Sequence, residues 1–177
     1  MKTDLLTTPE DKKNPQTTVV MTINVPANEA FDYIAPIYLP RIFPGTALIP
    51  GIADTSVKEG WNKAGLSRTV YFKDGTTSRE TMLTYNGPKS FSYKNEQFSS
   101  KMLGALMTRL EGEWQFIDLK NGSTKIVWIY RTIPKGSFSR LFIKYVLIKA
   151  LNGMLVKALT IAKQDLESGN LVGANFK

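Results

Sequence analysis

Short runs of alternating apolar and polar residues fill most of the chain, and turn residues separate the runs. This alternation is typical of strands that bury one face. It predicts strands at residues 17–25, 53–58, 66–72, 76–85, 90–98, 108–119 and 123–133. Several of the later runs are joined by short links with Asp-Gly or Asn-Gly, which favour hairpins. We therefore expect one curved antiparallel sheet of about seven strands.

Two parts of the chain follow a helical period instead. Residues 27–34 have helical spacing, and the prolines that follow leave room for at most one more short helix near 38–42. From Phe138 to Ser168 apolar residues recur in steps of four and three, and Gly169 is a natural stop. The main predicted stripe is Leu141, Tyr145, Ile148, Asn152, Leu155, Leu159, Ala162 and Leu166. A second stripe consists of Leu147, Leu151, Met154, Ala158 and Ile161. A helix this apolar must be covered on most sides.

The loop lengths of two hairpins decide which side chains share a face of the sheet. Residues 73–75 and 120–122 each fit a three-residue loop that ends in a left-handed glycine; a two-residue loop is the alternative. In the later hairpin only the longer loop collects the large aromatic residues on one face. Those residues are Trp114, Phe116, Trp128 and Tyr130. Burying them together is worth a few kcal/mol each, so we predict three-residue loops.

The same loop in the earlier hairpin places Arg68 opposite Glu80, on a face that also carries Val70 and Phe72. Charged side chains on an apolar face need partners, and these two can supply each other's. Two interpretations stay open at this point. The pair is either a structural contact at the sheet edge or surface, or a polar group in the wall of a pocket that offers donors and acceptors to a bound molecule.

Composition narrows the chemistry that the chain can perform. The 177 residues suggest one domain, which we place at residues 17–168, with a flexible arm at 1–16 and a tail at 169–177. The chain has neither cysteine nor histidine, so thiolate and imidazole chemistry are excluded, and we expect neither a metal nor a cofactor. The polar start lacks the apolar core of a signal peptide, which predicts a cytoplasmic protein.

The net charge of +8 could attract nucleic acid, anionic lipid or an acidic small molecule. The basic residues are scattered and match no nucleic-acid module, so we expect no nucleic-acid partner. The terminal helix carries several of them, with two phenylalanines near its start. These residues are Arg140, Lys144, Lys149, Lys157, Lys163, Phe138 and Phe142. They predict either a solvated basic face or a weak contact with an anionic membrane.

The order of elements resembles the START/birch-pollen-allergen superfamily (SRPBCC), and most closely its polyketide cyclase/dehydrase branch. The segments that carry the resemblance are INVPANEAFDYI, YLPRIFP, LSRTVYFKDGTTSRETMLTY, PKSFSYK and GSTKIVWIYRTIPKG, followed by the long helix. The resemblance covers residues 17–168 and implies a helix-grip fold, an α+β architecture in which the sheet wraps the helix around a hydrophobic cavity. Arg68 and Glu80 stand where this branch usually has its arginine and glutamate. Trp128 and Tyr130 stand in its last-strand aromatic motif.

Members of this superfamily bind lipids, sterols, polyketides, quinones or plant hormones, and some assist polyketide ring closure. The resemblance therefore implies a binding or carrier protein for a hydrophobic small molecule. The candidate ligand-binding residues are Arg68, Phe72, Glu80, Met82, Trp114, Trp128, Tyr130, Asn152 and Met154.

Two other functions remain open. The first is a cofactor-free cyclase or dehydratase, a lyase-like enzyme, in which Glu80 acts as acid or base and Arg68 stabilises an enolate. An arginine held against Glu80 favours its charged form and makes it a weaker base, so we rank binding first. The second is lipid transfer at anionic membranes. Neither the ligand nor the oligomeric state follows from these patterns.

Overall fold

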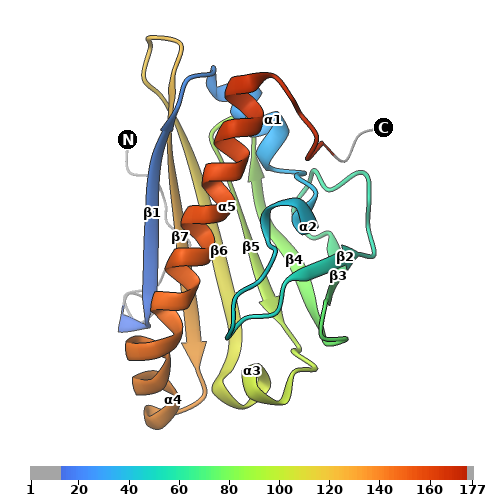
Figure 1. Cartoon of the computed structure of the whole chain (residues 1–177), viewed down its shortest axis with the longest axis vertical. Helices are drawn as coiled ribbons and strands as arrows, with labels where there is room; N and C mark the ends of the chain where they lie inside the picture. Colours follow the sequence, from blue (N-terminus) through green and yellow to red (C-terminus); the bar gives the residue numbers. More distant parts are fainter. Residues whose placement is uncertain (1–12, 175–177) are drawn as a thin grey trace.

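One antiparallel sheet forms most of the fold and curves around the C-terminal helix (Figure 1). The computed structural model describes residues 13–174. The strands are β1 (Gln16–Ile23), β2 (Ile52–Thr55), β3 (Ser67–Phe72), β4 (Thr77–Asn86), β5 (Ser90–Glu96), β6 (Met107–Asp118) and β7 (Thr124–Pro134). Their order across the seven-stranded sheet is β1-β7-β6-β5-β4-β3-β2. The helix-grip fold predicted from the sequence is confirmed.

The helices lie at the ends and on the concave face of the sheet. Helices α1 (Ala27–Ile34) and α2 (Leu39–Ile42) connect β1 to β2. Helix α3 (Lys101–Leu106) connects β5 to β6; the sequence indicated only a break there, although the Ser100 side chain caps this helix by accepting a hydrogen bond from the Leu103 amide. Helix α4 (Ser137–Phe142), the π-helical segment η2 (Ile143–Leu147) and α5 (Ile148–Ser168) then run on continuously until Gly169, whose φ of 70° ends the helix.

The predicted hairpin registers are confirmed. Loops of three residues join β3 to β4 and β6 to β7, and each ends in a glycine with positive φ, 82° at Gly75 and 83° at Gly122. Arg68 consequently faces Glu80, and Trp114 faces Trp128. The two indole rings stack with their centres 3.9 Å apart.

The core near α1 is filled by aromatic rings. Phe31 makes edge contacts with Tyr85, Phe91 and Phe116, with ring centres 5.1, 6.0 and 5.2 Å apart. Such pairs add about 0.5–1.5 kcal/mol beyond the burial of their area. Aromatic side chains therefore fill much of this end of the space between helix and sheet.

The main predicted stripe is wrong at the start of the terminal helix. Leu141 and Tyr145 are 55% and 59% exposed, whereas Ile143 and Leu147 are buried against the sheet. The π-turn of η2 shifts the phase of the helix, because each π-bonded turn takes one residue more than an α-turn. Farther along α5 the buried side is the predicted one, with Leu155, Leu159, Ala162 and Leu166 facing inward.

The ends of the domain are tied to its body. The predicted arm lies outside the described residues up to residue 12, and Gln16 is already part of β1. At the other end, the amide of Gly173 donates to the Tyr33 hydroxyl at 3.0 Å. By length and composition the helix from Ser137 to Ser168 could cross a membrane, but in this fold it is the core helix that the sheet surrounds.

Candidate functional site

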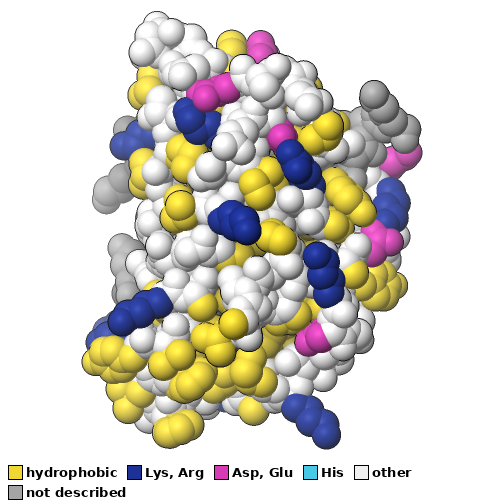
Figure 2. Space-filling view, viewed as in Figure 1, with side chains coloured by type: hydrophobic (Ala, Val, Ile, Leu, Met, Phe, Trp, Pro, Cys, Tyr) yellow, Lys and Arg dark blue, Asp and Glu magenta, His cyan; other side chains and the backbone are white. Residues whose placement is uncertain are grey.

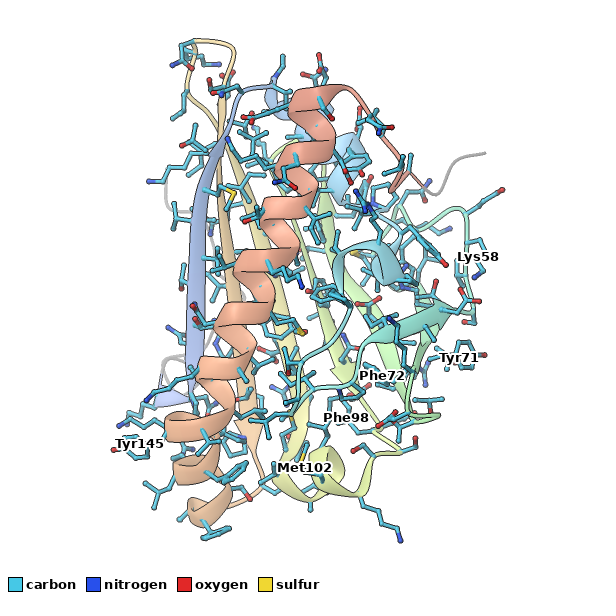
Figure 3. The ribbon with its side chains drawn as sticks, in the orientation of Figure 1. Lys58, Tyr71, Phe72, Phe98, Met102 and Tyr145 are labelled. Carbon is cyan, nitrogen blue, oxygen red and sulfur yellow. The ribbon has the colours of Figure 1, made fainter. Side chains whose placement is uncertain are left out.

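A cavity of about 90 Å³ lies between the sheet and the terminal helix. Strands β3 to β7 form one side of it, η2 and α5 the second, and α2 with the loop before β2 the third. Its surface is mainly apolar. The lining residues Phe72, Phe98 and Pro50 are only partly buried. Figure 3 shows Phe72 and Phe98 on the same side of the molecule.

The Arg68–Glu80 pair lies in the wall of this cavity. The guanidinium Nε donates to Glu80 Oε2 at 2.5 Å, and the two side chains are 3% and 5% exposed. The other carboxylate oxygen accepts from Asn95 Nδ2 at 3.3 Å, and Asn95 Oδ1 accepts from Ser78 Oγ at 3.0 Å. The Trp61 ring covers the guanidinium, with 4.2 Å between Arg68 Cζ and the ring centre.

The strand registers explain why these groups meet. Arg68 pairs with Glu80 across β3 and β4, and Glu80 pairs with Asn95 across β4 and β5. All three side chains therefore stand on the concave face of the sheet, next to each other in one row. Trp61 comes from the loop between β2 and β3 and closes this row from the edge of the sheet.

Two buried donors at this site have no acceptor among residues 13–174. One is Arg68 Nη1. The other is the indole Nε1 of Trp128, which interacts with the Tyr93 hydroxyl without making a well-aligned hydrogen bond to it. Both residues line the cavity. A buried donor that lacks a partner costs about 1–3 kcal/mol of folding free energy, and more when it is charged. Arg68 Nη1 in particular is a charged donor that the described side chains leave without an acceptor.

Two phenols stand beside the ion pair. Tyr93 and Tyr130 are buried, with ring centres 6.5 Å apart. Burial, and next the charge of Glu80, raise the pKa of Tyr93 well above its ordinary value. Burial, followed by the charges of Tyr93 and Glu80, does the same to the pKa of Tyr130. Both phenols stay protonated at neutral pH and can donate hydrogen bonds.

Gly112 makes the room that the Tyr93 ring occupies. A β-carbon at this position would lie 2.3 Å from Tyr93 Cζ. Gly112 pairs with Tyr93 on β5 and with Tyr130 on β7, so the phenols flank a strand position that has no side chain. The glycine therefore fixes where the phenols stand relative to the cavity.

The sequence profile of the family described as "Polyketide cyclase / dehydrase and lipid transport" matches residues 15–167. The chain belongs to this family. A comparison with curated protein sequences finds no match.

Solved structures share the fold across most of the chain. A START superfamily protein from Mycobacterium smegmatis has a TM-score of 0.63 at 10% identity, and the match covers 88% of this chain and 99% of that one. The Zhui aromatase/cyclase from a Streptomyces species has a TM-score of 0.60 at 14% identity, with 86% and 93% covered. Ara h 8.0201 has a TM-score of 0.63 at 13% identity, with 86% and 97% covered. Identities this low show the helix-grip fold alone.

Most of the residues that the sequence singled out as ligand-binding line the cavity of this family member. They are Arg68, Phe72, Glu80, Trp114, Trp128, Tyr130 and Met154. Two do not line it. Met82 lies two residues beyond Glu80 on β4 and is fully buried in the filled core. Asn152 faces β1 instead, where its Nδ2 donates to Thr17 Oγ1 at 2.6 Å.

Among the polar and aromatic members of the site that sequence reasoning missed, three lie close to the ion pair: Asn95, Tyr93 and Trp61. Asn95 and Tyr93 alternate with Lys94 on β5, so the register that placed Glu80 inward would have placed them beside it. Trp61 lies in a loop, where no strand periodicity indicates its direction. Its only signal was a large aromatic residue between two glycines, Gly60 and Gly65.

Proposed function

We propose that this chain binds a hydrophobic small molecule that carries an uncharged hydrogen-bond acceptor, such as a ketone or quinone oxygen. The observation that supports this proposal is the pair of buried donors without acceptors, Arg68 Nη1 and Trp128 Nε1, in a cavity that is otherwise mainly apolar. Small-molecule sites commonly combine apolar walls with a few converging polar groups. A carbonyl oxygen can accept the hydrogen bond that Arg68 Nη1 lacks.

The charge balance favours an uncharged acceptor over a carboxylate. Glu80 already neutralises Arg68 at 2.5 Å, so the buried pair carries no net charge. An anionic ligand would bring a second negative charge close to Glu80 in a poorly solvated space. A carbonyl group accepts the free N–H without adding charge.

The volume limits how much of the ligand fits without rearrangement. An engineered protein cavity of about 150 Å³ holds one benzene, whereas this cavity measures about 90 Å³. It therefore takes the acceptor group and a few carbon atoms. The rest of a larger ligand must extend past the partly buried Phe72 and Phe98, or displace a flexible side chain such as Met154.

Membership of a family described as polyketide cyclase/dehydrase and lipid transport supports hydrophobic ligand binding or a cyclase role, without selecting one. The contacts of Glu80 favour binding. Its carboxylate accepts from Arg68 and from Asn95, so both oxygens are already engaged. Donors held against a carboxylate, one of them a cation, favour its charged form and make it a weaker base. We therefore propose a binding or carrier role ahead of an enzyme in which Glu80 is the base.

Calorimetric titrations with three matched probes test the proposal. Acetophenone carries the ketone, ethylbenzene replaces it with a methylene group, and benzoate replaces it with a charge. We expect acetophenone to bind about tenfold more tightly than ethylbenzene, because it alone satisfies a charged donor. Benzoate should bind most weakly. Equal affinities for acetophenone and ethylbenzene, or tightest binding of benzoate, would contradict the proposed acceptor.

Native mass spectrometry of the chain purified from its own host addresses the natural ligand. We expect a co-purified small molecule that is rich in carbon and contains a carbonyl oxygen. The matched control is Arg68→Met/Glu80→Leu, which keeps the volume of the pair while removing its charges. This control should lose the bound molecule or retain much less of it.

A further inference from the structure

An apolar surface without a covering element lies at the end of the molecule where α3 and α4 meet. It consists of Met102, Phe138, Leu141, Tyr145 and Val146, which we call the end surface; each is at least 40% exposed, and Phe138 reaches 81%. Helix α3 contacts α4, and Figure 3 shows Met102 and Tyr145 at the same end. Figure 2 shows hydrophobic side chains gathered over this end of the molecule.

The π-turn creates this surface. Phe138, Leu141 and Tyr145 follow one another at steps of three and four, so they share one face of the helix. Without the phase shift at η2 the stripe of Leu155 and Leu159 would continue through Leu141 and Tyr145 and bury them. The fold instead buries Ile143 and Leu147 and leaves an amphipathic turn with its apolar side in solvent.

The segment of the chain that carries most of the end surface contains basic residues and no acidic ones. Residues 119–164 contain nine lysines and arginines and no aspartate or glutamate, whereas the rest of the chain has fourteen basic and fifteen acidic residues. The basic residues of this segment are dispersed, but no acidic residue lies between them. Five cations lie near the end surface. Lys101 is on α3, Lys135 precedes α4, and Arg140, Lys144 and Lys149 are on the terminal helix. Within residues 13–174 none of them forms an ion pair.

We propose that the end surface docks onto the surface of an anionic lipid bilayer. Exposed aromatic and aliphatic side chains flanked by unpaired lysines are the signature of a helix that lies in a membrane interface. Each lysine near such a surface adds attraction to anionic headgroups. The side chains stand on the outside of two helices, which suits a broad bilayer surface.

The end surface is also linked to the cavity. On α3, Met102 is exposed while its neighbour Leu103 lines the cavity. On η2, Tyr145 is exposed while Leu147 lines the cavity. Docking would therefore bring a membrane against the two elements that close this end of the ligand space. The docking proposal stands whether or not the proposed ligand binds.

Vesicle sedimentation with the full chain tests the docking. The probes are phosphatidylcholine vesicles with and without about 30 mol % phosphatidylserine, at about 0.1 M and about 0.5 M salt. We expect binding to the anionic vesicles, and an at least fivefold loss at the higher salt. Phe138→Ser should lower the partition coefficient about tenfold, and Lys144→Glu about fivefold or more.

Matched controls at the other end of the molecule separate docking from general stickiness. Leu171→Ser removes an apolar side chain that is 47% exposed, and Lys125→Glu reverses an exposed charge of the same segment. Both should change the partition coefficient less than about twofold. The proposal is overturned if neither vesicle binds, if the controls lose as much as the end-surface variants, or if the chain forms a dimer that Phe138→Ser dissociates and binds no vesicles.

Discussion

The Arg41–Asp165 ion pair joins two helices and the Arg68–Glu80 ion pair joins two strands, and their surroundings differ. Asp165 on α5 accepts from Arg41 Nη2 at 2.7 Å, from Arg41 Nε at 3.3 Å and from the Tyr33 hydroxyl at 2.7 Å. The Arg41 side chain is 42% exposed, so water can accept hydrogen bonds from the N–H groups that Asp165 does not bind. Arg68 and Glu80 are both buried, and the Nη1 of Arg68 has no acceptor within the described residues.

The difference separates a structural contact from the group that we propose faces a ligand. The Asp165 network closes on itself, joining α1, α2, α5 and the segment after α5. The Glu80 network is closed on the carboxylate side and open on the guanidinium side, where the cavity lies. An unused charged donor costs folding free energy. Its presence next to a cavity is therefore better explained by binding than by stability.

The largest expected effect comes from breaking the buried pair. Glu80→Leu should lower the free energy of unfolding by about 3–5 kcal/mol, because it leaves the Arg68 charge buried without a partner. The double variant Arg68→Met/Glu80→Leu should recover most of that loss, since it removes both charges. Urea denaturation of the single and double variants measures both values. Equal destabilisation of the two would contradict the assignment of a desolvated, mutually neutralising pair.

The closed network should respond differently. Asp165→Asn should cost about 2–3 kcal/mol, because it weakens charged hydrogen bonds while a half-exposed Arg41 returns to water. Acetophenone affinity, measured by calorimetry on the folded variant, should stay unchanged. A loss of ligand affinity larger than the scatter between replicate titrations would show that the two networks are not independent.

Gly112→Ala sharpens the comparison by acting on the cavity without removing a charge. The added β-carbon would overlap the Tyr93 ring and push it from its place. Overpacking of this kind costs about 1–3 kcal/mol. Calorimetry should show weaker binding of acetophenone. A crystal structure of the variant should show the Tyr33–Asp165 hydrogen bond unchanged. Undiminished binding would show that the position of Tyr93 does not shape the site.

The smallest effect is expected at Gly153 on α5. Gly153 is exposed and does not line the cavity, and a β-carbon there would meet no atom within 4 Å. The glycine therefore neither makes space in the cavity nor permits a close strand contact. Gly153→Ala should raise the free energy of unfolding by about 0.5–1 kcal/mol through helix propensity. Thermal unfolding measures the change, and affinity for acetophenone should not move. A destabilised variant would indicate a contact that the structure does not contain.

The sequence was sufficient for the fold and for the central pair, and the reasons can be traced to particular residues. The glycines at 75 and 122 determine the loop lengths, and the loop lengths determine that Arg68 meets Glu80 and Trp114 meets Trp128. Local turn chemistry therefore carried the information. The same argument, extended by one strand, would have found Asn95.

Other features depend on tertiary packing and could not be predicted from periodicity. The π-turn at η2 inverts which residues are buried at the start of the terminal helix, and an apolar stripe cannot report such a phase shift. The direction of Trp61 depends on the path of a loop. The size of the cavity depends on how far stacked rings such as Trp114 and Trp128 fill the space, which composition does not determine.

The indole N–H of Trp128 reports on the central claim most directly. The chain has three tryptophans, so a proton–nitrogen correlation spectrum shows three indole signals, and Trp128→Phe identifies the relevant one. Titration with acetophenone should move the Trp128 signal downfield as its donor gains an acceptor, whereas ethylbenzene should leave it nearly in place. If both probes move the signal equally, or if neither moves it, the proposal that this cavity binds a carbonyl ligand is contradicted.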